Sequence, residues 1–311
     1  MKGHKVLITG GAGFIGSNLA EFLSADNEVH IIDNLSTGNK ANIKGLKVHF
    51  IKGSITNQKD VAAAMKGMDY VFHLGALPSV PRSIKDPVAV NEANVTGTLN
   101  VLVAARDCGI RKLVFAASSS AYGDTPTLPK VETMPPNPLS PYALTKLAGE
   151  YYCKIFNDVY GLPTTSLRYF NVYGPKQNPD SEYAAVIPKF ITFIKNGQPP
   201  TIFGDGEQSR DFTFVRDAVR GTVLAATRKE SDGTVINIAG GRRITVNELT
   251  RKIGALLGRD PKPEYLESRA GDVKHSLASI DRARKLLGYD PEYDIDAGLN
   301  ETIKSFMIKE T

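Results

Sequence analysis

The 311-residue sequence lacks the features that mark secreted and membrane proteins. Its two cysteines, Cys108 and Cys153, form no CxxC pair, so neither a disulfide framework nor a cysteine metal site is expected. No apolar stretch is long enough to span a bilayer, and the apolar run at 6–8 is too short for a signal peptide. We therefore expect a cytoplasmic protein with no membrane partner.

Concentrated charge is lacking as well. The formal net charge is +5, but Lys and Arg are scattered among acidic residues and form no runs. Nucleic acid is therefore not an expected partner, and a small anionic ligand fits the charge as well. The five histidines show no metal-ligand spacing, so no metal site is predicted. His73 follows an apolar run, and we interpret it as a core residue and not a catalyst.

The first segment reads as a strand, a glycine turn and a helix. A strand-like run at 5–9 precedes glycines at positions 10, 13 and 16, a GxxGxxG spacing. Such glycines let backbone N–H groups approach a pyrophosphate at a helix N-terminus. Asp33 ends the next strand-like run, where a carboxylate can accept from both ribose hydroxyls and repel a 2′-phosphate. No Arg follows at 34 or 35, so NAD is favoured over NADP. A turn or helix cap is the alternative reading of Asp33.

Strand-like and helical patterns alternate through the first half of the chain. Apolar runs at 48–51, 70–74 and 112–116 are separated by helical patterns such as 94–107. This alternation predicts an α/β fold with a Rossmann-type, doubly wound parallel sheet. Ligands of such sheets bind beyond the carboxyl ends of the strands, so functional residues are expected there. Helices ended by glycine are also expected at 245–258 and 281–288.

A helix beginning near Ser140 would place Tyr142 and Lys146 on one face, because residues four apart are neighbours. The lysine is expected to lower the pKa of the tyrosine, so that the phenolate can act as a base. A cation about 5 Å away supplies roughly 3 kcal/mol at an effective dielectric near 20. A fall of about 3 pKa units needs roughly 4 kcal/mol. Ser118 follows a strand and can reach the same substrate oxygen; a chance pair and an ordinary polar loop are the alternatives.

Five motifs together are specific for one family. They are Gly10-x-x-Gly13-x-x-Gly16, Asp33-Asn34-Leu35-Ser36-Thr37-Gly38, Asn94-Val95-x-Gly97-Thr98, Ser118-Ser119-Ser120-Ala121-Tyr122-Gly123 and Tyr142-x-x-x-Lys146. This set resembles the extended short-chain dehydrogenase/reductase family. The segments 168–175 and 210–212 narrow the resemblance to nucleotide-sugar 4-epimerases.

The resemblance implies two domains and a homodimer. Residues 1–170 are expected to form an NAD-binding Rossmann domain, and residues 171–311 a smaller α/β domain that binds a UDP-linked hexose. Part of 212–240 is expected to pack back on the first domain. Pairing of two chains is expected through the helices at 94–107 and 142–157.

The resemblance also implies the roles of single residues. Tyr142 matches the base, Lys146 the residue that lowers its pKa and holds the nicotinamide ribose, and Ser118 the hydroxyl that bonds the sugar oxygen at C4. The implied contacts of NAD are Gly10, Gly13, Phe14, Ile15, Gly16, Asp33, Asn34, Ser36, Thr37, Gly38, Ser54, Ile55, Leu74, Gly75, Ala76, Asn94, Tyr142, Lys146 and Tyr169.

On the substrate side, Asn171 matches a residue that contacts the diphosphate, and Arg210 and Arg269 match two arginines that clamp it. A surface salt bridge is the alternative reading of either arginine. The implied substrate contacts are Ser79, Ser83, Ser118, Ser119, Ser120, Asn171, Ala185, Val186, Lys189, Phe203, Arg210, Arg269, Asp272 and Ser276.

The residues at 119 and 120 indicate the reaction. Related dehydratases and decarboxylases are expected to carry acidic residues there, whereas this chain has two serines, which favours epimerisation at C4. Ser276 aligns with the family's size gate, and its small side chain indicates room for a 2-acetamido group. Ser83 can bond that group or cap a helix. The resemblance therefore predicts interconversion of UDP-GlcNAc and UDP-GalNAc.

Four alternatives stay open at this point. The first is a UDP-glucose/UDP-galactose or dual-specificity epimerase. UDP-glucuronate is another substrate, for which Arg82 supplies a cation. A one-way nucleotide-sugar dehydrogenase is the third. A non-catalytic NAD-binding protein is the fourth, although such a protein is expected to have lost the Tyr and Lys.

Overall fold

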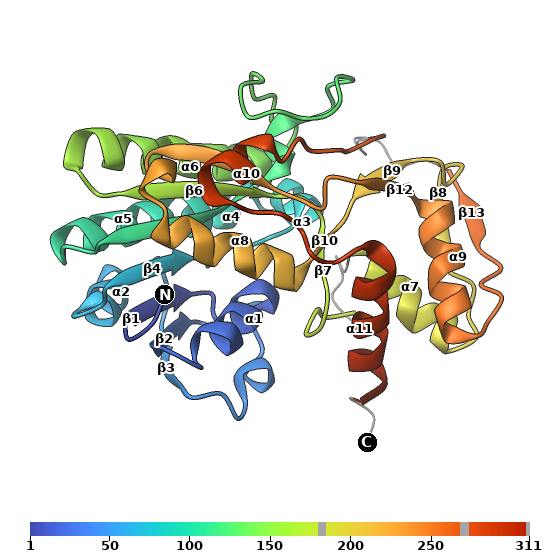
Figure 1. Ribbon diagram of the computed structural model, residues 1–311, viewed down its shortest axis with the longest axis horizontal. Helices are drawn as coiled ribbons and strands as arrows, with labels where there is room; N and C mark the ends of the chain where they lie inside the picture. Colours follow the sequence, from blue (N-terminus) through green and yellow to red (C-terminus); the bar gives the residue numbers. More distant parts are fainter. Residues whose placement is uncertain (180–184, 268–273, 309–311) are drawn as a thin grey trace.

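The centre of the molecule is a seven-stranded, wholly parallel sheet in the order β11-β6-β5-β4-β1-β2-β3 (Figure 1). The computed structural model describes residues 1–179, 185–267 and 274–308. The strand order reverses between β1 and β4, and such a switch point is where open α/β sheets bind ligands. The predicted Rossmann-type fold is confirmed. The strands are β1 (Lys5–Thr9), β2 (Glu28–Asp33), β3 (Val48–Lys52), β4 (Tyr70–His73), β5 (Lys112–Ser118), β6 (Thr164–Tyr169) and β11 (Thr234–Ile238).

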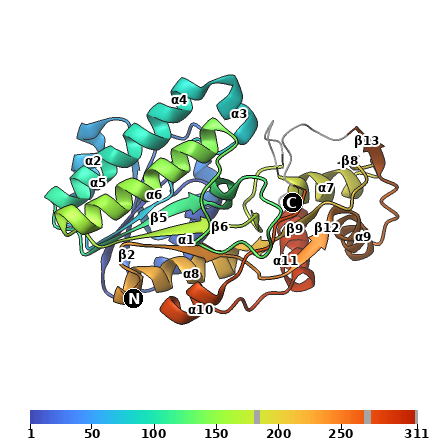
Figure 2. The ribbon, with the colours of Figure 1, turned by 90° about the horizontal axis from the view of Figure 1, so that it is seen from above.

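Helices cover both faces of this sheet (Figure 2). Alternate residues of β1 show the two layers: Leu7 packs in one buried cluster, and Val6 and Ile8 pack in another. Burial on both faces explains why the strands read as continuous apolar runs. One layer holds α2 (Gln58–Met65), α5 (Gly97–Asp107) and α6 (Pro141–Tyr160), and the other holds α1 (Phe14–Leu23) and α8 (Val215–Thr227).

Helix α6 begins and ends where its sequence signals predict. Ser140 is the N-cap, and its Oγ accepts from the Ala143 N–H at 3.2 Å. Pro141 fills the first turn, where its missing N–H costs no hydrogen bond. Gly161 ends the helix in the left-handed conformation at φ +68°. Although α6 is 20 residues long, none of the helices in the described ranges has the length and apolar content to cross a membrane.

The helix expected at 94–107 is preceded by an irregular turn. Residues Glu92–Thr96 form a π-helical turn, and α5 follows directly. Before it lie two short helices, α3 (Val80–Lys85) and α4 (Pro87–Asn91). Short 3₁₀ helices occupy Lys40–Ile43, Ser119–Tyr122 and Lys229–Ser231.

The rest of the chain forms a second group of elements beside the sheet. Its strands pair two by two: β7 (Val172–Tyr173) with β10 (Thr213–Phe214), β9 (Ser209–Asp211) with β12 (Arg243–Thr245), and β8 (Thr201–Phe203) with β13 (Glu264–Leu266). Its helices are α7 (Val186–Lys195), α9 (Val246–Leu257), α10 (Asp281–Leu287) and α11 (Ile295–Ile308). Helices α9 and α10 confirm the two predicted helices, each ended by a left-handed glycine.

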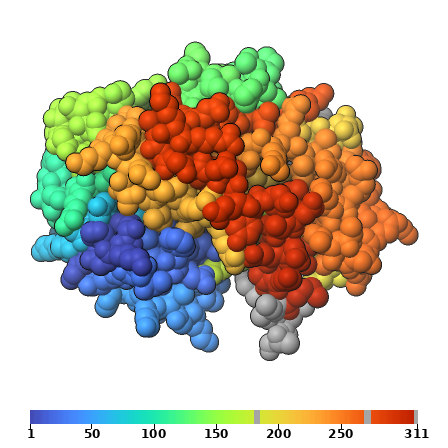
Figure 3. Space-filling view, viewed as in Figure 1, coloured from blue at the N-terminus to red at the C-terminus, as the bar shows by residue number. Residues whose placement is uncertain are grey.

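One apolar core joins these two groups of elements. Ile8 of β1 belongs to the same buried cluster as Phe190 of α7 and Leu249 of α9. In the space-filling view, the C-terminal segment that holds α10 and α11 lies across the front of the molecule (Figure 3). The second group of elements is therefore packed firmly against the sheet.

Candidate active site

The turn between β1 and α1 is a cradle of backbone atoms. Gly10 has φ +69°, and a Cβ built on it would lie 2.7 Å from the Gly75 N. A Cβ on Gly16 would lie 2.3 Å from the Gly10 carbonyl oxygen, so side chains are excluded at both positions. The N-cap of α1, Gly13, makes no side-chain cap hydrogen bond, and the first turn of α1 holds no acidic residue. Free N–H groups at the positive end of a helix suit a pyrophosphate.

Asp33 lies beside this cradle at the end of β2. Its Oδ2 accepts from the Ala12 N–H at 3.0 Å, and its Oδ1 accepts from the Leu35 N–H at 2.8 Å. A Cβ on Gly38 would lie 2.9 Å from either carboxylate oxygen. Each carboxylate oxygen has two lone pairs, so capacity remains for the two ribose hydroxyls of NAD. The glycine cradle and this carboxylate fit the dinucleotide.

Most other residues predicted to contact NAD follow strands on the same edge of the sheet. They are partly or fully exposed, as a ligand site requires. They are Asn34, Ser36 and Thr37 after β2, Ser54 and Ile55 after β3, and Leu74, Gly75 and Ala76 after β4, together with Phe14 and Ile15 at the start of α1.

Asn94 and Tyr169, also predicted to contact NAD, are buried and hydrogen-bonded within the protein. The Asn94 Oδ1 accepts from the Leu77 N–H at 2.8 Å, and its Nδ2 donates to the Leu77 carbonyl and to the Thr145 Oγ1 at 3.3 and 3.1 Å. Asn94 therefore fixes the loop after β4 to α6. The Tyr169 hydroxyl bonds the Thr222 Oγ1 at 2.6 Å, and burial raises the pKa of Tyr169 to about 12. The side chain of Tyr169 holds β6 to α8.

His73 lies in a buried chain of hydrogen bonds. The Thr98 Oγ1 donates to the Asn94 carbonyl at 2.6 Å, so it accepts from the His73 Nε2 at 2.8 Å. The other ring nitrogen, Nδ1, then accepts from the Thr9 hydroxyl at 2.7 Å, and Thr9 accepts from the Gly75 N–H at 3.0 Å. Burial lowers the pKa of His73 to about 3, so the ring is neutral. The interpretation of His73 as a core residue is confirmed.

The structure brings Tyr142 of α6 together with the serines after β5. Ser118 hydrogen-bonds Tyr142, and this bond lowers the pKa of the phenol. The Ser118 Oγ also accepts from the Ser120 Oγ at 2.8 Å and from the Ser120 N–H at 3.2 Å. A serine oxygen has two acceptor lone pairs, and both are occupied by Ser120. The Ser118 hydroxyl hydrogen is thus left to donate to a phenolate or to a sugar oxygen.

The ammonium of Lys146 is turned toward β5 in this structure. The Lys146 Nζ donates to the Ala116 carbonyl at 2.7 Å and lies 5.0 Å from the centre of the Phe115 ring. Burial lowers the pKa of Lys146 to about 8. Burial also raises the pKa of Tyr142 above its ordinary value, and only the hydrogen bond from Ser118 opposes it. The lowering of the Tyr142 pKa by Lys146 stays a prediction.

Asn171 and Ser276, 105 residues apart, meet beside β9. The Ser276 Oγ accepts from the Asn171 Nδ2 and from the Asp211 N–H, both at 3.3 Å, and the Asn171 Nδ2 also donates to the Asp211 carbonyl at 2.9 Å. Asn171 has φ +37°, which this network holds in place. The sequence singled out both residues but not Asp211, which positions them.

Asp211 is fully buried, and its carboxylate accepts from the Gly240 and Ala278 N–H groups at 3.0 and 3.1 Å. Burial raises the pKa of Asp211 to about 7. The place of Asp211 inside the 210–212 motif is the signal in the sequence that could have pointed to this residue.

The other predicted substrate residues lie in the second group of elements or outside the described residues. Arg210 is half-buried, and its Nη1 donates to the Ser209 and Lys274 carbonyls at 3.1 and 3.2 Å. Ala185, Val186 and Lys189 lie at the start of α7, and Phe203 ends β8. Arg269 and Asp272 lie outside the described residues, so the predicted pair of arginines has one described member.

The serines at 79 and 83 take structural roles. The Ser79 Oγ accepts from the Arg82 N–H at 3.1 Å and caps α3, in a strained conformation with φ +139°. Ser83 is fully buried, and its hydroxyl donates to the Val80 carbonyl at 2.7 Å. The bond from Ser83 to an acetamide stays a prediction.

The whole chain resembles known proteins at the level of sequence and structure. Residues 6–239 match the family model described as the NAD dependent epimerase/dehydratase family. The chain belongs to this family. The predictions of the family, of NAD as the cofactor and of an NAD-dependent isomerase are confirmed.

Three relatives of this family member differ in the sugar that their names give. A UDP-N-acetylglucosamine 4-epimerase from Methanobrevibacter ruminantium M1, in complex with UDP-N-acetylmuramic acid, is 42% identical with a TM-score of 0.96, over 99% of this chain and 100% of that chain. A putative UDP-glucose 4-epimerase of Methanocaldococcus jannaschii is 40% identical, over 96% of this chain and 97% of the relative. A UDP-glucuronate 4-epimerase of Thermodesulfobacterium geofontis is 37% identical, over 96% and 94%.

Proposed function

We propose that the protein is a UDP-sugar 4-epimerase that interconverts UDP-GlcNAc and UDP-GalNAc. The observation that carries this proposal is the cluster of Tyr142, Ser118 and Ser120 at the carboxyl end of β5, beside the nucleotide cradle. NAD supplies the hydride acceptor and donor for C4 of the sugar. The residues of the chain then have to move one proton and hold the nucleotide.

Proton transfer is the task of the cluster. The Tyr142 phenolate takes the proton of the C4 hydroxyl, and the Ser118 hydroxyl donates to the same sugar oxygen. Because Ser120 occupies both lone pairs of Ser118, it keeps Ser118 in the donating orientation. Ser120 is a positioning residue in this scheme. Lys146, bonded to the carbonyl of Ala116, is proposed to hold the nicotinamide ribose.

Nucleotide binding is the task of the second group of elements. The 4-keto sugar has to present its other face before hydride returns, so firm contacts belong on the diphosphate. Arg210 is proposed to bind the diphosphate by charge-assisted hydrogen bonds, with Asn171 beside it. The fixed network of Asn171, Asp211 and Ser276 supports this placement.

Specificity for the acetamido sugar is proposed to rest on Ser276. Its side chain is small, half-buried and held by two hydrogen bonds beside Asn171. The 42% identity to a UDP-N-acetylglucosamine 4-epimerase supports the same sugar. The alternatives are UDP-glucose, which the name of another relative gives, and then UDP-glucuronate, for which Arg82 is the candidate cation.

Proton NMR of the anomeric signals tests this proposal directly. The purified protein, with no cofactor added, is incubated separately with UDP-GlcNAc, UDP-glucose and UDP-glucuronate. Conversion of UDP-GlcNAc at a rate equal to or above that of UDP-glucose is expected. Conversion of UDP-glucose alone keeps the epimerase and overturns the role of Ser276. Conversion of UDP-glucuronate alone would show that the substrate is the uronic acid.

We further propose a homodimer formed through α5 and α6. Helix α6 exposes an apolar stripe at spacings of seven and four residues, in which Leu144, Tyr151 and Val159 are 57%, 55% and 69% exposed. Ile155 lies in the same stripe and is 46% exposed. A contiguous apolar stripe on a helix of this length is typical of a protein interface.

The division into domains stays a proposal as well: residues 1–170 for NAD and residues 171–311 for the nucleotide sugar. The pairing of β11 with β6 and the packing of α8 beside α1 support the return of part of 212–240 to the first domain. The cytoplasmic location stays a prediction.

A further inference from the structure

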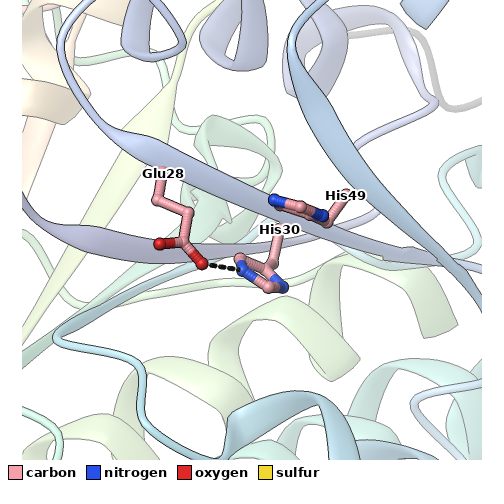
Figure 4. A group of neighbouring side chains, drawn as sticks. All are labelled: Glu28, His30 and His49. Atoms are coloured by element: carbon pink, nitrogen blue, oxygen red, sulfur yellow. Dashed lines mark hydrogen bonds and ion pairs between the residues drawn. The ribbon is translucent and has the colours of Figure 1, made fainter.

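Three potential metal ligands meet on one face of the sheet, away from the active-site edge. His30 of β2 and His49 of β3 are register partners in neighbouring strands. Glu28 lies two residues before His30, so its side chain points to the same face. Figure 4 shows the carboxylate of Glu28 directed at the His30 ring, with the His49 ring alongside.

The distances suit a single ion. The Glu28 Oε1 lies 2.8 Å from the His30 Nε2, and the two imidazole rings stack with centroids 4.6 Å apart. One ligand atom from each of the three side chains lies within 4.8 Å of the others. Zinc binds histidine nitrogen and carboxylate oxygen at about 2.0 to 2.2 Å, so the three side chains have to rotate toward a common point to bind it.

The surroundings leave the site accessible to an ion. Glu28 and His49 are exposed, and the His30 side chain is 19% exposed. Lys5 of β1 pairs with the other carboxylate oxygen of Glu28 at 3.3 Å, so Oε1 still faces His30.

We propose that Glu28, His30 and His49 bind one divalent transition-metal ion, such as Zn²⁺, which joins β2 to the edge strand β3. Two imidazoles and a carboxylate are a ligand set for zinc, nickel or copper, whereas Mg²⁺ and Ca²⁺ prefer oxygen ligands. Water completes the coordination. Because β2 ends at Asp33, the ion ties the edge of the sheet to the strand that carries the ribose ligand. Binding to the folded state alone stabilises it by mass action.

Zinc binding to the purified holoenzyme tests the proposal. The protein is treated with EDTA, dialysed against low-micromolar ZnCl₂, and its zinc is counted by mass spectrometry while its melting temperature is recorded. One zinc per chain and a melting temperature that rises with zinc are expected. The same concentrations of Mg²⁺ and Ca²⁺ are expected to leave the melting temperature unchanged.

The variants His49→Ala and His30→Gln identify the ligands. Each is expected to weaken zinc binding at least about tenfold, since even outer partners of metal ligands have effects of that size. The matched control is His4→Ala, because His4 also lies beside a carboxylate, with its Nδ1 3.6 Å from Asp69. Circular dichroism and NAD content confirm that each variant is folded.

Two outcomes overturn the proposal. One is that wild type holds no more zinc than His49→Ala. The other is that His4→Ala loses zinc to the same extent as His49→Ala, which would place the ion elsewhere. Neither outcome changes the epimerase proposal, because the three ligands take no part in it.

Discussion

At the scale of single residues, the surroundings of Tyr142 bear on its proposed role as the proton acceptor. The phenol lies where burial raises its pKa, and Ser118 is the hydrogen-bonding side chain that lowers it. The charge that was expected from Lys146 is directed to β5 instead. In the proposed mechanism, the Ser118 hydroxyl stabilises the phenolate, and Ser120 sets the direction in which Ser118 donates.

Replacing Tyr142 by Phe removes the proposed proton acceptor. We expect kcat to fall by about 100- to 10,000-fold, the usual contribution of a positioned acid or base. UDP affinity, measured by calorimetry, is expected to stay within about twofold of wild type, because the phenol takes no part in the proposed diphosphate contacts. Tyr160→Phe, at the exposed end of α6, is the control. A loss of UDP binding in Tyr142→Phe would contradict this role.

Replacing Ser120 by Ala frees one lone pair of Ser118 and lets its hydroxyl turn away from Tyr142. The pKa of Tyr142 then rises further, because the bond from Ser118 lowers it in the wild type. The phenolate is the active form, so kcat is expected to rise with pH and its half-maximum to move to higher pH in the variant. Ser119→Ala is the control for the loop. An equal loss of kcat at every pH would show that Ser120 does not act through the pKa.

Replacing Ser276 by Tyr fills the proposed space for the acetamido group. Overpacking typically costs 1 to 3 kcal/mol, so kcat/KM for UDP-GlcNAc is expected to fall roughly 10- to 200-fold. Turnover of UDP-glucose is expected to persist. Ser276→Ala removes the hydrogen bonds of the hydroxyl but keeps a small side chain, so turnover of UDP-GlcNAc is expected to persist. Equal losses for both sugars would remove Ser276 as the gate.

At the scale of elements, α6 carries the proposed catalytic side chains and packs against the sheet. Three of its residues, spaced four apart, lie on one face of the helix. Tyr142 hydrogen-bonds Ser118, and Lys146 donates to the Ala116 carbonyl of β5. Glu150 forms an ion pair with Arg168 of β6. The Glu150 and Arg168 pair is bidentate at 2.8 and 2.7 Å, and both side chains are buried. Through these contacts the helix aligns Tyr142 with the ends of two strands.

Replacing Glu150 by Ala leaves the Arg168 charge buried and unpaired. We expect a loss of about 3 to 5 kcal/mol in the free energy of unfolding, measured with denaturant. Lys154→Ala removes an exposed pair with Asp158 on the same helix and is expected to cost less than about 1 kcal/mol. The double variant Glu150→Met with Arg168→Met should recover most of the loss. Equal effects of Glu150→Ala and Lys154→Ala would show that the buried ion pair with Arg168 does not hold α6 to the sheet.

The secondary structure was largely predictable because its signals are local. Ser140, Pro141 and Gly161 bound α6 in the chain as in the structure, and apolar runs became the parallel strands. The π-helical turn before α5 was not predicted, since its register depends on Asn94 bonding Leu77 and Thr145. No periodicity in the sequence encodes that contact.

At the scale of the whole molecule, the apolar stripe of α6 predicts association. Light scattering is expected to give twice the chain mass of 33.7 kDa for wild type, and the single mass for the double variant Tyr151→Glu with Ile155→Glu. Phe22 of α1, 56% exposed, gives the control Phe22→Glu, which should stay dimeric. A monomeric wild type, or a dimeric double variant, would remove this interface.

The sequence by itself determined the features that depend on residues close in the chain. Glycines at 10, 13 and 16 permit a tight turn whose backbone is not covered by side chains. Asp33 follows a strand. The motifs together are specific enough to indicate the family. These features rest on backbone conformations that neighbouring residues impose.

Tertiary structure decided what depends on register and burial. Only the pairing of β2 with β3 brings His30 to His49, and only the fold brings Ser276 to Asn171 across 105 residues. Whether the pKa of Tyr142 is raised or lowered could not be predicted from the sequence either, since desolvation depends on every element packed around the phenol. A one-residue shift in the register of a strand would break contacts of this kind, because side chains alternate between the faces of a sheet. The sequence motifs would stay the same.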